Sequence, residues 1–296
     1  MRLTIWQELE NGILGGPKSK CFSAHINGKS VEIEISQNGI RNIVINSDDG
    51  TYSDILSLYY AFETLLMLFD GQFYTVTKAC DGTEITISWK KREPIKYTSA
   101  DYMIGSWNRL INFEEILDES IFLKWYELEN ELDLIHNMVL FCLSNADTPI
   151  DIKCAFMIEA YEGICELIHD KDQAFALPSV KNKESKLKKY FLSVVEKYGI
   201  DIFEKELIIN KQQFAQILVN SRNRIAHIKR KQDRQYLNGE ECVQFLIKLS
   251  FLYRVIIFDL LGIPVCKYYD KLKSQINRID ECKTMKTFIN NLPLND

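Results

Sequence analysis

The sequence predicts two folds in succession: a small, mostly antiparallel α+β domain at residues 1–95, and an all-α helical bundle at residues 96–296. Short segments that alternate polar and apolar residues, punctuated by Asn-Gly turns, fill the first part. Apolar residues at three- and four-residue steps fill the second part, as is typical of packed helices. The stretch from Lys90 to Pro94 is polar and ends in proline, which indicates a boundary between them.

The first part reads as a β-meander followed by a helix and a hairpin. Three strands are predicted, joined by the turns Asn27-Gly28 and Asn38-Gly39: Lys20–Ile26, Lys29–Gln37 and Arg41–Asn46. An apolar stripe then predicts a helix over Tyr52–Phe69, which Asp70-Gly71 ends. Two further strands, Phe73–Ala79 and Glu84–Trp89, flank a hairpin turn.

The second part is helical from about Ser99 onward, and Asp147-Thr148-Pro149 breaks its first long helix. The predicted helices are Phe113–Ala146, Asp151–Ile168, Lys181–Ile200, Gln212–Ile228, Glu240–Leu261 and Lys267–Asn290. A highly polar loop, Lys229–Asn238, separates the fourth from the fifth.

Composition restricts the class of protein. With 46% hydrophobic and 26% charged residues the chain can bury a sizeable core, and its net charge of -5 means that nucleic-acid binding would need a local basic patch. The N-terminus has no signal-peptide pattern, and Lys248, Arg254 and Asp259 interrupt the longest apolar stretch at helical spacing. We therefore expect a cytoplasmic protein with no membrane partner.

The cysteines do not predict a metal site. None of the 8 forms a C-x-x-C pair, and the 4 histidines do not cluster near them. We expect buried, reduced thiols, no metal and no cofactor.

The segment most suggestive of chemistry is the end of the helix Gln212–Ile228. Asn223 and His227 are four residues apart and share a face, and the long side chain of Arg222 can reach the same place. A guanidinium, an amide and an imidazole suit phosphodiester cleavage by an internal 2′-hydroxyl, because the imidazole moves protons near neutral pH and the guanidinium neutralises phosphoryl charge. The alternative is an ordinary surface helix with a solvated arginine and a capping histidine.

Two segments carry a resemblance to a known family. Ser221–His227 resembles the R-N-x-x-x-H motif of HEPN (higher eukaryotes and prokaryotes nucleotide-binding) domains, and Cys154–Cys165 resembles a helix of the ApeA-like HEPN group. The glycine that often follows the family's histidine is Ile228 here. The resemblance implies a four-helix bundle that forms a homodimer with a shared cleft, and a metal-independent endoribonuclease that acts in phage defence or as a toxin.

The resemblance also implies roles for the three residues. His227 would be the acid and base, Arg222 would contact the scissile phosphate, and Asn223 would orient these groups. The expected product is a 2′,3′-cyclic phosphate, and DNA would be refused because it lacks the attacking hydroxyl. The partners would be RNA, a second copy of the chain, and an antitoxin or trigger.

Neighbouring charges extend this hypothesis. A basic tract would bind the RNA backbone or be a solvated loop: Arg224, Lys229, Arg230, Lys231 and Arg234. The basic run Lys181–Lys189 is expected to be a solvated helix start. Glu162, and less so Glu159, would pair with Arg222 or be exposed.

A second function of a different class stays open. In that interpretation the helical domain is a non-catalytic dimerisation or nucleotide- and RNA-binding module, and the motif serves packing or ligand binding. The sequence does not assign a role to the N-terminal domain.

Overall fold

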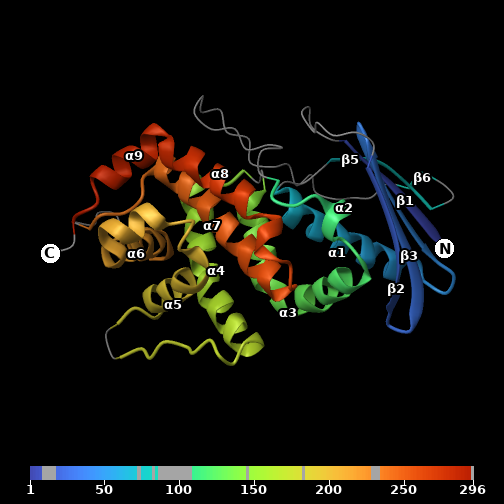
Figure 1. Ribbon diagram of the computed structural model, residues 1–296, viewed down its shortest axis with the longest axis horizontal. Helices are drawn as coiled ribbons and strands as arrows, with labels where there is room; N and C mark the ends of the chain where they lie inside the picture. The colour runs from blue at the N-terminus through green and yellow to red at the C-terminus, as the bar shows by residue number, and fades with distance from the viewer. Residues whose placement is uncertain are drawn as a thin grey trace. The chain divides into compact units, whose positions relative to one another are not determined.

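The computed structural model describes residues 1–8, 18–71, 75–81, 84–85, 109–144, 147–181, 184–227 and 234–294 (Figure 1). It confirms an antiparallel sheet domain followed by a mostly helical region. The chain forms two compact units. The sheet unit is Met1–Tyr97, Met103–Glu131 and Leu261–Tyr269; the helical unit is Thr98–Tyr102, Leu132–Leu260 and Asp270–Asp296. The predicted boundary at residue 95 lies outside the described residues and stays a prediction.

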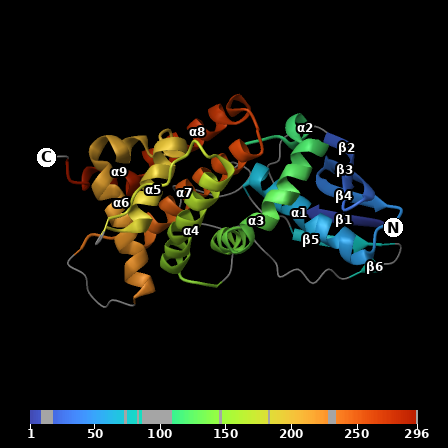
Figure 2. The same cartoon turned by 90° about the horizontal axis from the view of Figure 1, so that it is seen from below.

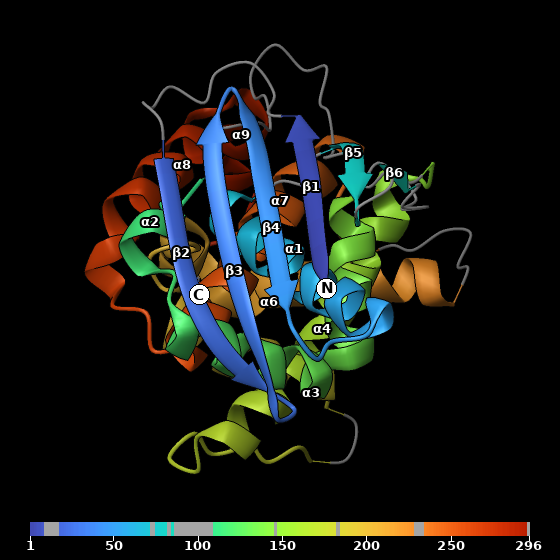
Figure 3. The same cartoon turned by 90° about the vertical axis from the view of Figure 1, so that its right-hand side faces the viewer.

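The described sheet has six strands in the order β2-β3-β4-β1-β5-β6, and every neighbouring pair is antiparallel (Figure 3). The strands are β1 (Arg2–Glu8), β2 (Lys18–Ile26), β3 (Lys29–Asn38), β4 (Ile40–Ser47), β5 (Thr75–Cys80) and β6 (Glu84–Ile85). The predicted meander β2-β3-β4 is confirmed, with the two Asn-Gly turns between its strands. β1, which the sequence analysis did not predict, lies between β4 and β5.

One face of the sheet packs under helix α1 (Tyr52–Asp70), and alternation along the strands builds this core. In β3, Val31, Ile33 and Ile35 are buried while the residues between them are exposed, as a strand with one solvated face requires. Helix α1 begins with a capping box between Thr51 and Asp54 and ends at Gly71, whose φ of 73° favours glycine.

A short helix, α2 (Phe113–Ile116), lies against β2, the strand at one edge of the described sheet. The ammonium of Lys18 lies 3.3 Å from the carboxylate of Glu114, and Lys20 donates to the backbone oxygen of Glu114 at 3.3 Å. Both lysines therefore tie this edge to the helix.

Most remaining helices belong to the helical unit, where α4 contacts α5, α6 and α7 (Figure 2). The elements are α3 (Glu119–Leu143), α4 (Ile150–Lys171), α5 (Lys186–Val194), the π-turn Val195–Gly199, α6 (Glu204–Ala226), α7 (Gly239–Leu260), the 3₁₀ turn Val265–Lys267, α8 (Tyr269–Glu281) and α9 (Lys283–Asn290). Within the described residues, none of the helices is both long enough and apolar enough to span a bilayer.

Several predicted helices are divided. Helix α3 is interrupted at Asp133 (φ 35°), close to the border of the two units. Helix α6 begins earlier than predicted, at Glu204, and is interrupted at Asn210, just before the predicted start at Gln212; the side chain of Asn210 accepts from the backbone N–H of Gln213 at 2.9 Å and so caps the following segment. The predicted last helix is two helices that meet at Cys282.

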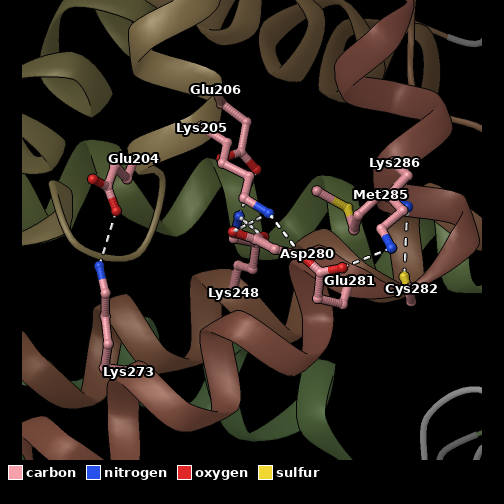
Figure 4. A network of polar contacts seen from close by, with 10 residues as sticks. All are labelled: Glu204, Lys205, Glu206, Lys248, Lys273, Asp280, Glu281, Cys282, Met285 and Lys286. Atoms are coloured by element: carbon pink, nitrogen blue, oxygen red, sulfur yellow. Dashed lines mark hydrogen bonds and ion pairs between the residues drawn. The ribbon is translucent and has the colours of Figure 1, made fainter.

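Each unit has a cluster of charged side chains around a buried ion. In the sheet unit, Asp70 Oδ2 lies 2.7 Å from Arg41 Nη2, and Asp70 Oδ1 lies 2.6 Å from Arg109 Nε. In the helical unit, Lys248 Nζ lies 2.6 Å from Glu206 Oε1 and 2.8 Å from Asp280 Oδ1, and Lys205 Nζ lies 3.9 Å from Asp280 Oδ2 (Figure 4). Lys248, one of the charges that interrupt the longest apolar stretch, is fully buried because two carboxylates satisfy its charge.

Candidate functional site

The R-N-x-x-x-H segment forms the last turns of α6. Arg222, Asn223 and Arg224 are helical and half-buried, and His227 is the C-cap residue, with φ -109° and ψ 6°. The apolar positions Phe214, Ile217 and Leu218 are buried on the side of this helix that lies away from Asn223 and His227. Helix α6 is held against α4, and this packing sets what the motif can contact.

Arg222 is held in a fixed orientation by two neighbours. Its Nε and Nη2 donate to both oxygens of Glu159 on α4, the latter at 2.6 Å, and its Nη1 donates to Oδ1 of Asn223 at 2.9 Å. The hydrogen bond to Glu159 raises the pKa of Arg222, and the negative charge of Glu162 adds to this. Three of the five N–H donors of the guanidinium are thus used, which leaves two for a ligand.

The sequence predicted that Glu162, and less so Glu159, would pair with Arg222, and in the structure Glu159 forms this pair. Glu162 Oε1 lies 2.8 Å from Lys186 Nζ, and Glu159 makes the contact with Arg222. The two carboxylates are three residues apart on one face of α4, so sequence spacing alone does not choose between them. Lys186, at the start of α5, forms ion pairs with both Glu162 and Glu166.

His227 is exposed at the end of α6. Its backbone N–H donates to the carbonyl of Asn223 at 3.1 Å, and its imidazole makes no hydrogen bond to the described residues. The structure therefore links Arg222 and Asn223 directly and places the imidazole one turn away, open to solvent. Its role as acid and base stays a prediction.

The predicted basic tract is only partly within the described residues. Arg224 Nη1 lies 4.0 Å from Asp151 Oδ2, and the guanidinium carbon lies 4.3 Å from the centre of the Tyr236 ring. The positive charge of Arg224 therefore already has a carboxylate and an aromatic partner. Arg234 is exposed. The other three predicted RNA-binding residues, Lys229, Arg230 and Lys231, lie outside the described residues.

Sequence reasoning missed a group of amide side chains on the same helix. A pocket is lined by Gln213, Gln216, Asn220, Arg234 and Gln235. Lys188, from the run expected to be a solvated helix start, donates to Oε1 of Gln216 at 3.3 Å. A signal was present, since Gln213, Gln216 and Asn220 recur at helical spacing with Asn223 and His227.

The contacts of the remaining histidines and of the cysteines do not suggest a catalytic role. His136 bonds the hydroxyl of Tyr253 at 2.7 Å inside the core, and His169 bonds a backbone oxygen. All eight cysteines are free thiols, and five of them are buried. Burial raises the pKa of Cys142 and of Cys165 to about 12, which makes these thiols unreactive. Among the described residues, no group of three or more His, Cys, Asp or Glu side chains is placed to hold a metal ion.

One comparison with known proteins found a match. Residues 157–265 match the family model described as Apea-like HEPN, and this segment includes Glu159, the amide pocket and the whole motif. The chain therefore contains an ApeA-like HEPN domain at residues 157–265, as the motif predicted. No curated protein and no solved structure matches the chain.

Proposed function

We propose that this protein is a metal-independent endoribonuclease that cleaves RNA by attack of a 2′-hydroxyl on the neighbouring phosphate. The main supporting observation is the arrangement of Arg222: Glu159 and Asn223 hold its guanidinium, and two N–H donors stay free. A preorganised donor pair suits the phosphoryl oxygens, whose negative charge rises in the transition state.

The proposed reaction needs a base, an acid and a cationic group. The 2′-hydroxyl gives its proton to a base, its oxygen attacks phosphorus, and the bond from phosphorus to the 5′-oxygen of the next nucleotide breaks. An acid protonates that 5′-oxygen, so the products are a 2′,3′-cyclic phosphate and a 5′-hydroxyl. His227 supplies proton transfer, Arg222 binds the phosphate, and Asn223 keeps Arg222 in place.

A second copy of the chain would supply the second imidazole. Each chain has one His227, whereas the reaction uses a base and an acid. Phe156 on α4 lies three residues before Glu159 and is 42% exposed, so one large apolar side chain near the motif is open to solvent. We propose a homodimer that buries Phe156 and brings two motifs to one cleft.

The activity is tested with single-stranded RNA in EDTA. We expect the wild type to cut the RNA and to leave the matching DNA intact, and His227→Ala to lose about 100-fold or more of the rate. The matched control is His25→Ala, because His25 is exposed on β2 in the other unit. Cleavage that persists in His227→Ala, or that stops equally in His25→Ala, would overturn the proposal.

Glu159 is a positioning residue in this scheme, and its test separates orientation from folding. We expect Glu159→Gln to lower kcat roughly tenfold with little change in KM, because the guanidinium keeps its charge but loses its fixed orientation. Glu162→Gln is the matched control on the same face of α4 and should cut RNA like the wild type. Equal effects of the two substitutions would argue against a specific role for Glu159.

The dimer is tested by mass in solution. We expect Phe156→Asp to give a monomer that no longer cuts RNA, whereas Ile208→Asp, which alters an apolar residue that is 72% exposed on α6, should stay dimeric. A monomeric Phe156→Asp protein with full activity would refute the shared cleft.

A non-catalytic module is the second candidate, and one observation favours it. Glu159 partly neutralises Arg222 in the structure, as in an ordinary structural ion pair. In that case neither wild type nor His227→Ala cuts RNA, while dimerisation or RNA binding persists.

The biological setting is proposed from the HEPN family alone. We propose a cytoplasmic role in phage defence or as a toxin, restrained by an antitoxin or released by a trigger. Co-purification followed by mass measurement tests for such a partner, and activity that appears only after its removal would support the restraint.

A further inference from the structure

The amide pocket has the size and chemistry of a ligand site. Its volume is about 480 Å³, within the range of roughly 300–1,000 Å³ typical of small-molecule sites. Four of its five lining side chains are carboxamides, which present a donor and an acceptor side by side: Gln213, Gln216, Asn220 and Gln235. The fifth is Arg234.

The pocket lies on the same face of α6 as the motif. Gln213, Gln216, Asn220, Asn223 and His227 follow one another at steps of three and four residues. With a rise of 1.5 Å per residue, seven residues of helix separate Asn220 from His227 by roughly 10 Å. A bound RNA strand that placed a phosphate at the motif could therefore place a neighbouring base in the pocket.

The charge around the pocket suits a nucleotide. Lys188 and Arg234 carry positive charge there, and within the described part of the chain neither forms an ion pair with a carboxylate. Arg222 and Arg224, by contrast, both face acidic partners. In a chain of net charge -5, two cations without carboxylate partners at one polar pocket indicate an anionic ligand.

The amides are arranged before any ligand binds. Asn220 Nδ2 donates to the backbone oxygen of Gln235 at 2.9 Å, and Gln216 Nε2 donates to Oδ1 of Asn220 at 3.0 Å. These bonds hold the floor of the pocket in place. The contact from Gln213 Nε2 to Gln235 Oε1 is long, 3.5 Å, and it leaves Gln213 Oε1 as an acceptor and Gln235 Nε2 as a donor.

We propose that this pocket binds a purine base of the RNA strand, preferentially adenine, next to the phosphate that the motif contacts; the inference rests on the proposed ribonuclease function. A carboxamide pairs with adenine through an acceptor for N6–H₂ and a donor for N7, which is the pair that Gln213 and Gln235 leave open. Lys188 and Arg234 contact the phosphates on either side of that base. Single-stranded RNA is the expected source of this base, because its bases can leave the stack and enter a pocket.

The test measures binding and cleavage separately. Binding of fluorescent oligoadenylate, oligocytidylate and oligouridylate is measured with the His227→Ala protein, so that the RNA stays intact. We expect oligoadenylate to bind about tenfold more tightly than the pyrimidine oligomers, and Gln213→Leu to remove this preference. Arg234→Gln should weaken binding of all three oligomers equally and reduce the salt dependence.

Two matched controls come from the same unit. Gln212 is the exposed neighbour of Gln213 on α6 but does not line the pocket, so Gln212→Leu should keep the adenine preference. Arg278 is exposed on α8, so Arg278→Gln controls for the loss of one positive charge. Circular dichroism of each variant establishes that it is folded.

The outcomes distinguish this inference from the proposed function. Equal binding of all oligomers, or an adenine preference that survives Gln213→Leu, would overturn the base site even if the wild type cuts RNA. Adenine-selective binding without cleavage would instead overturn the nuclease and leave the pocket as a base-recognition site. Free AMP that binds as tightly as oligoadenylate would show that the pocket takes a free nucleotide, which contradicts the proposed RNA source.

Discussion

Each unit has an ion cluster, and the two clusters differ in the ion at their centre. In the sheet unit the carboxylate of Asp70 lies between the guanidinium groups of Arg41 and Arg109. In the helical unit the ammonium of Lys248 lies between the carboxylates of Glu206 and Asp280. A second lysine, Lys205, lies 3.9 Å from Oδ2 of Asp280, but its side chain is 42% exposed.

This difference shifts the pKa of Asp70 and the pKa of Glu206 in opposite directions. Burial alone would raise the pKa of Asp70, but its two arginine partners lower it below its usual value. Burial also raises the pKa of Glu206, and Lys248 offsets only part of that effect while Asp280 adds to it. Two guanidinium partners outweigh the effect of burial on Asp70, whereas Lys248, which Glu206 shares with Asp280, does not outweigh it for Glu206.

The stability that these two carboxyl groups contribute should therefore change with pH in opposite directions. Because the pKa of Asp70 is lower in the folded state, its contribution to stability is present above about pH 4 and is lost as the pH falls through the folded-state pKa. Because the pKa of Glu206 is higher in the folded state, its contribution is present in acid and is lost as the pH rises through that pKa.

The tryptophans allow the units to be followed separately. Trp6 and Trp125 lie in the described part of the sheet unit, so tryptophan fluorescence follows the unfolding of this unit. Far-ultraviolet circular dichroism is dominated by helix and reports mainly the helical unit.

The largest effect is expected when the buried ammonium is removed. Lys248→Met leaves Glu206 buried without its cation and leaves Asp280 with only the partly exposed Lys205, so it should lower the free energy of unfolding of the helical unit by about 3–5 kcal/mol. Urea denaturation followed by circular dichroism measures this loss. A loss below about 1 kcal/mol would mean that water reaches the cluster.

A somewhat smaller effect is expected in the sheet unit. Asp70→Asn leaves Arg41 buried beside a neutral amide and should cost about 2–4 kcal/mol at neutral pH, measured by tryptophan fluorescence. Asp49→Asn, at an exposed position, is the control and should change stability by less than about 0.5 kcal/mol. The cost of Asp70→Asn should shrink below about pH 4, and a cost that is independent of pH would contradict the assignment.

Neutralising Glu206 should have an effect of opposite sign. Burial raises the pKa of Glu206, so Glu206→Gln removes a carboxylate whose ionised form is disfavoured, and Lys248 keeps Asp280 as a partner. The free energy of unfolding of the helical unit at neutral pH should therefore stay the same or rise by up to about 1 kcal/mol. The difference from the wild type should vanish as the pH falls. A clear destabilisation at neutral pH would show that the ionised form of Glu206 is the one the fold requires.

The smallest effect is expected at an exposed cluster in which, as around Lys248, one ammonium lies between two carboxylates. Lys186 Nζ lies 2.8 Å from both Glu162 and Glu166, and the Lys186 side chain is 43% exposed. Lys186→Met should therefore cost less than about 1 kcal/mol by circular dichroism, because solvent screens these charges. A loss as large as that of Lys248→Met would show that burial is not what separates the two clusters.

Local sequence signals predicted much of the fold. The Asn-Gly turns predicted the β2-β3-β4 meander, and apolar periodicity predicted α1, α4 and α7 within a few residues. Strand β1 was missed because its Leu3 and Ile5 alternation is short, and its central place depends on pairing with β4 and β5, which are distant in sequence. The breaks in α6 and α8–α9 depend on local caps at Asn210 and Cys282 that periodicity does not reveal.

The candidate site was predictable where residues lie on one helix and not where two helices meet. The motif spacing located Arg222, Asn223 and His227 on α6. The choice of Glu159 rather than Glu162 as the partner of Arg222 depends on how α4 packs against α6. The amide pocket requires Arg234 and Gln235, which lie within the polar loop Lys229–Asn238, to fold back onto α6.

The contact of α2 with strand β2 has a consequence for how this protein avoids association. An edge strand offers unpaired backbone groups to any other extended chain, and long edges of this kind promote aggregation. Lys18 and Lys20 both hold Glu114 close to β2. An incoming strand would first have to detach that helix and strip two ammonium groups of their partners, so this edge resists intermolecular β-sheet formation.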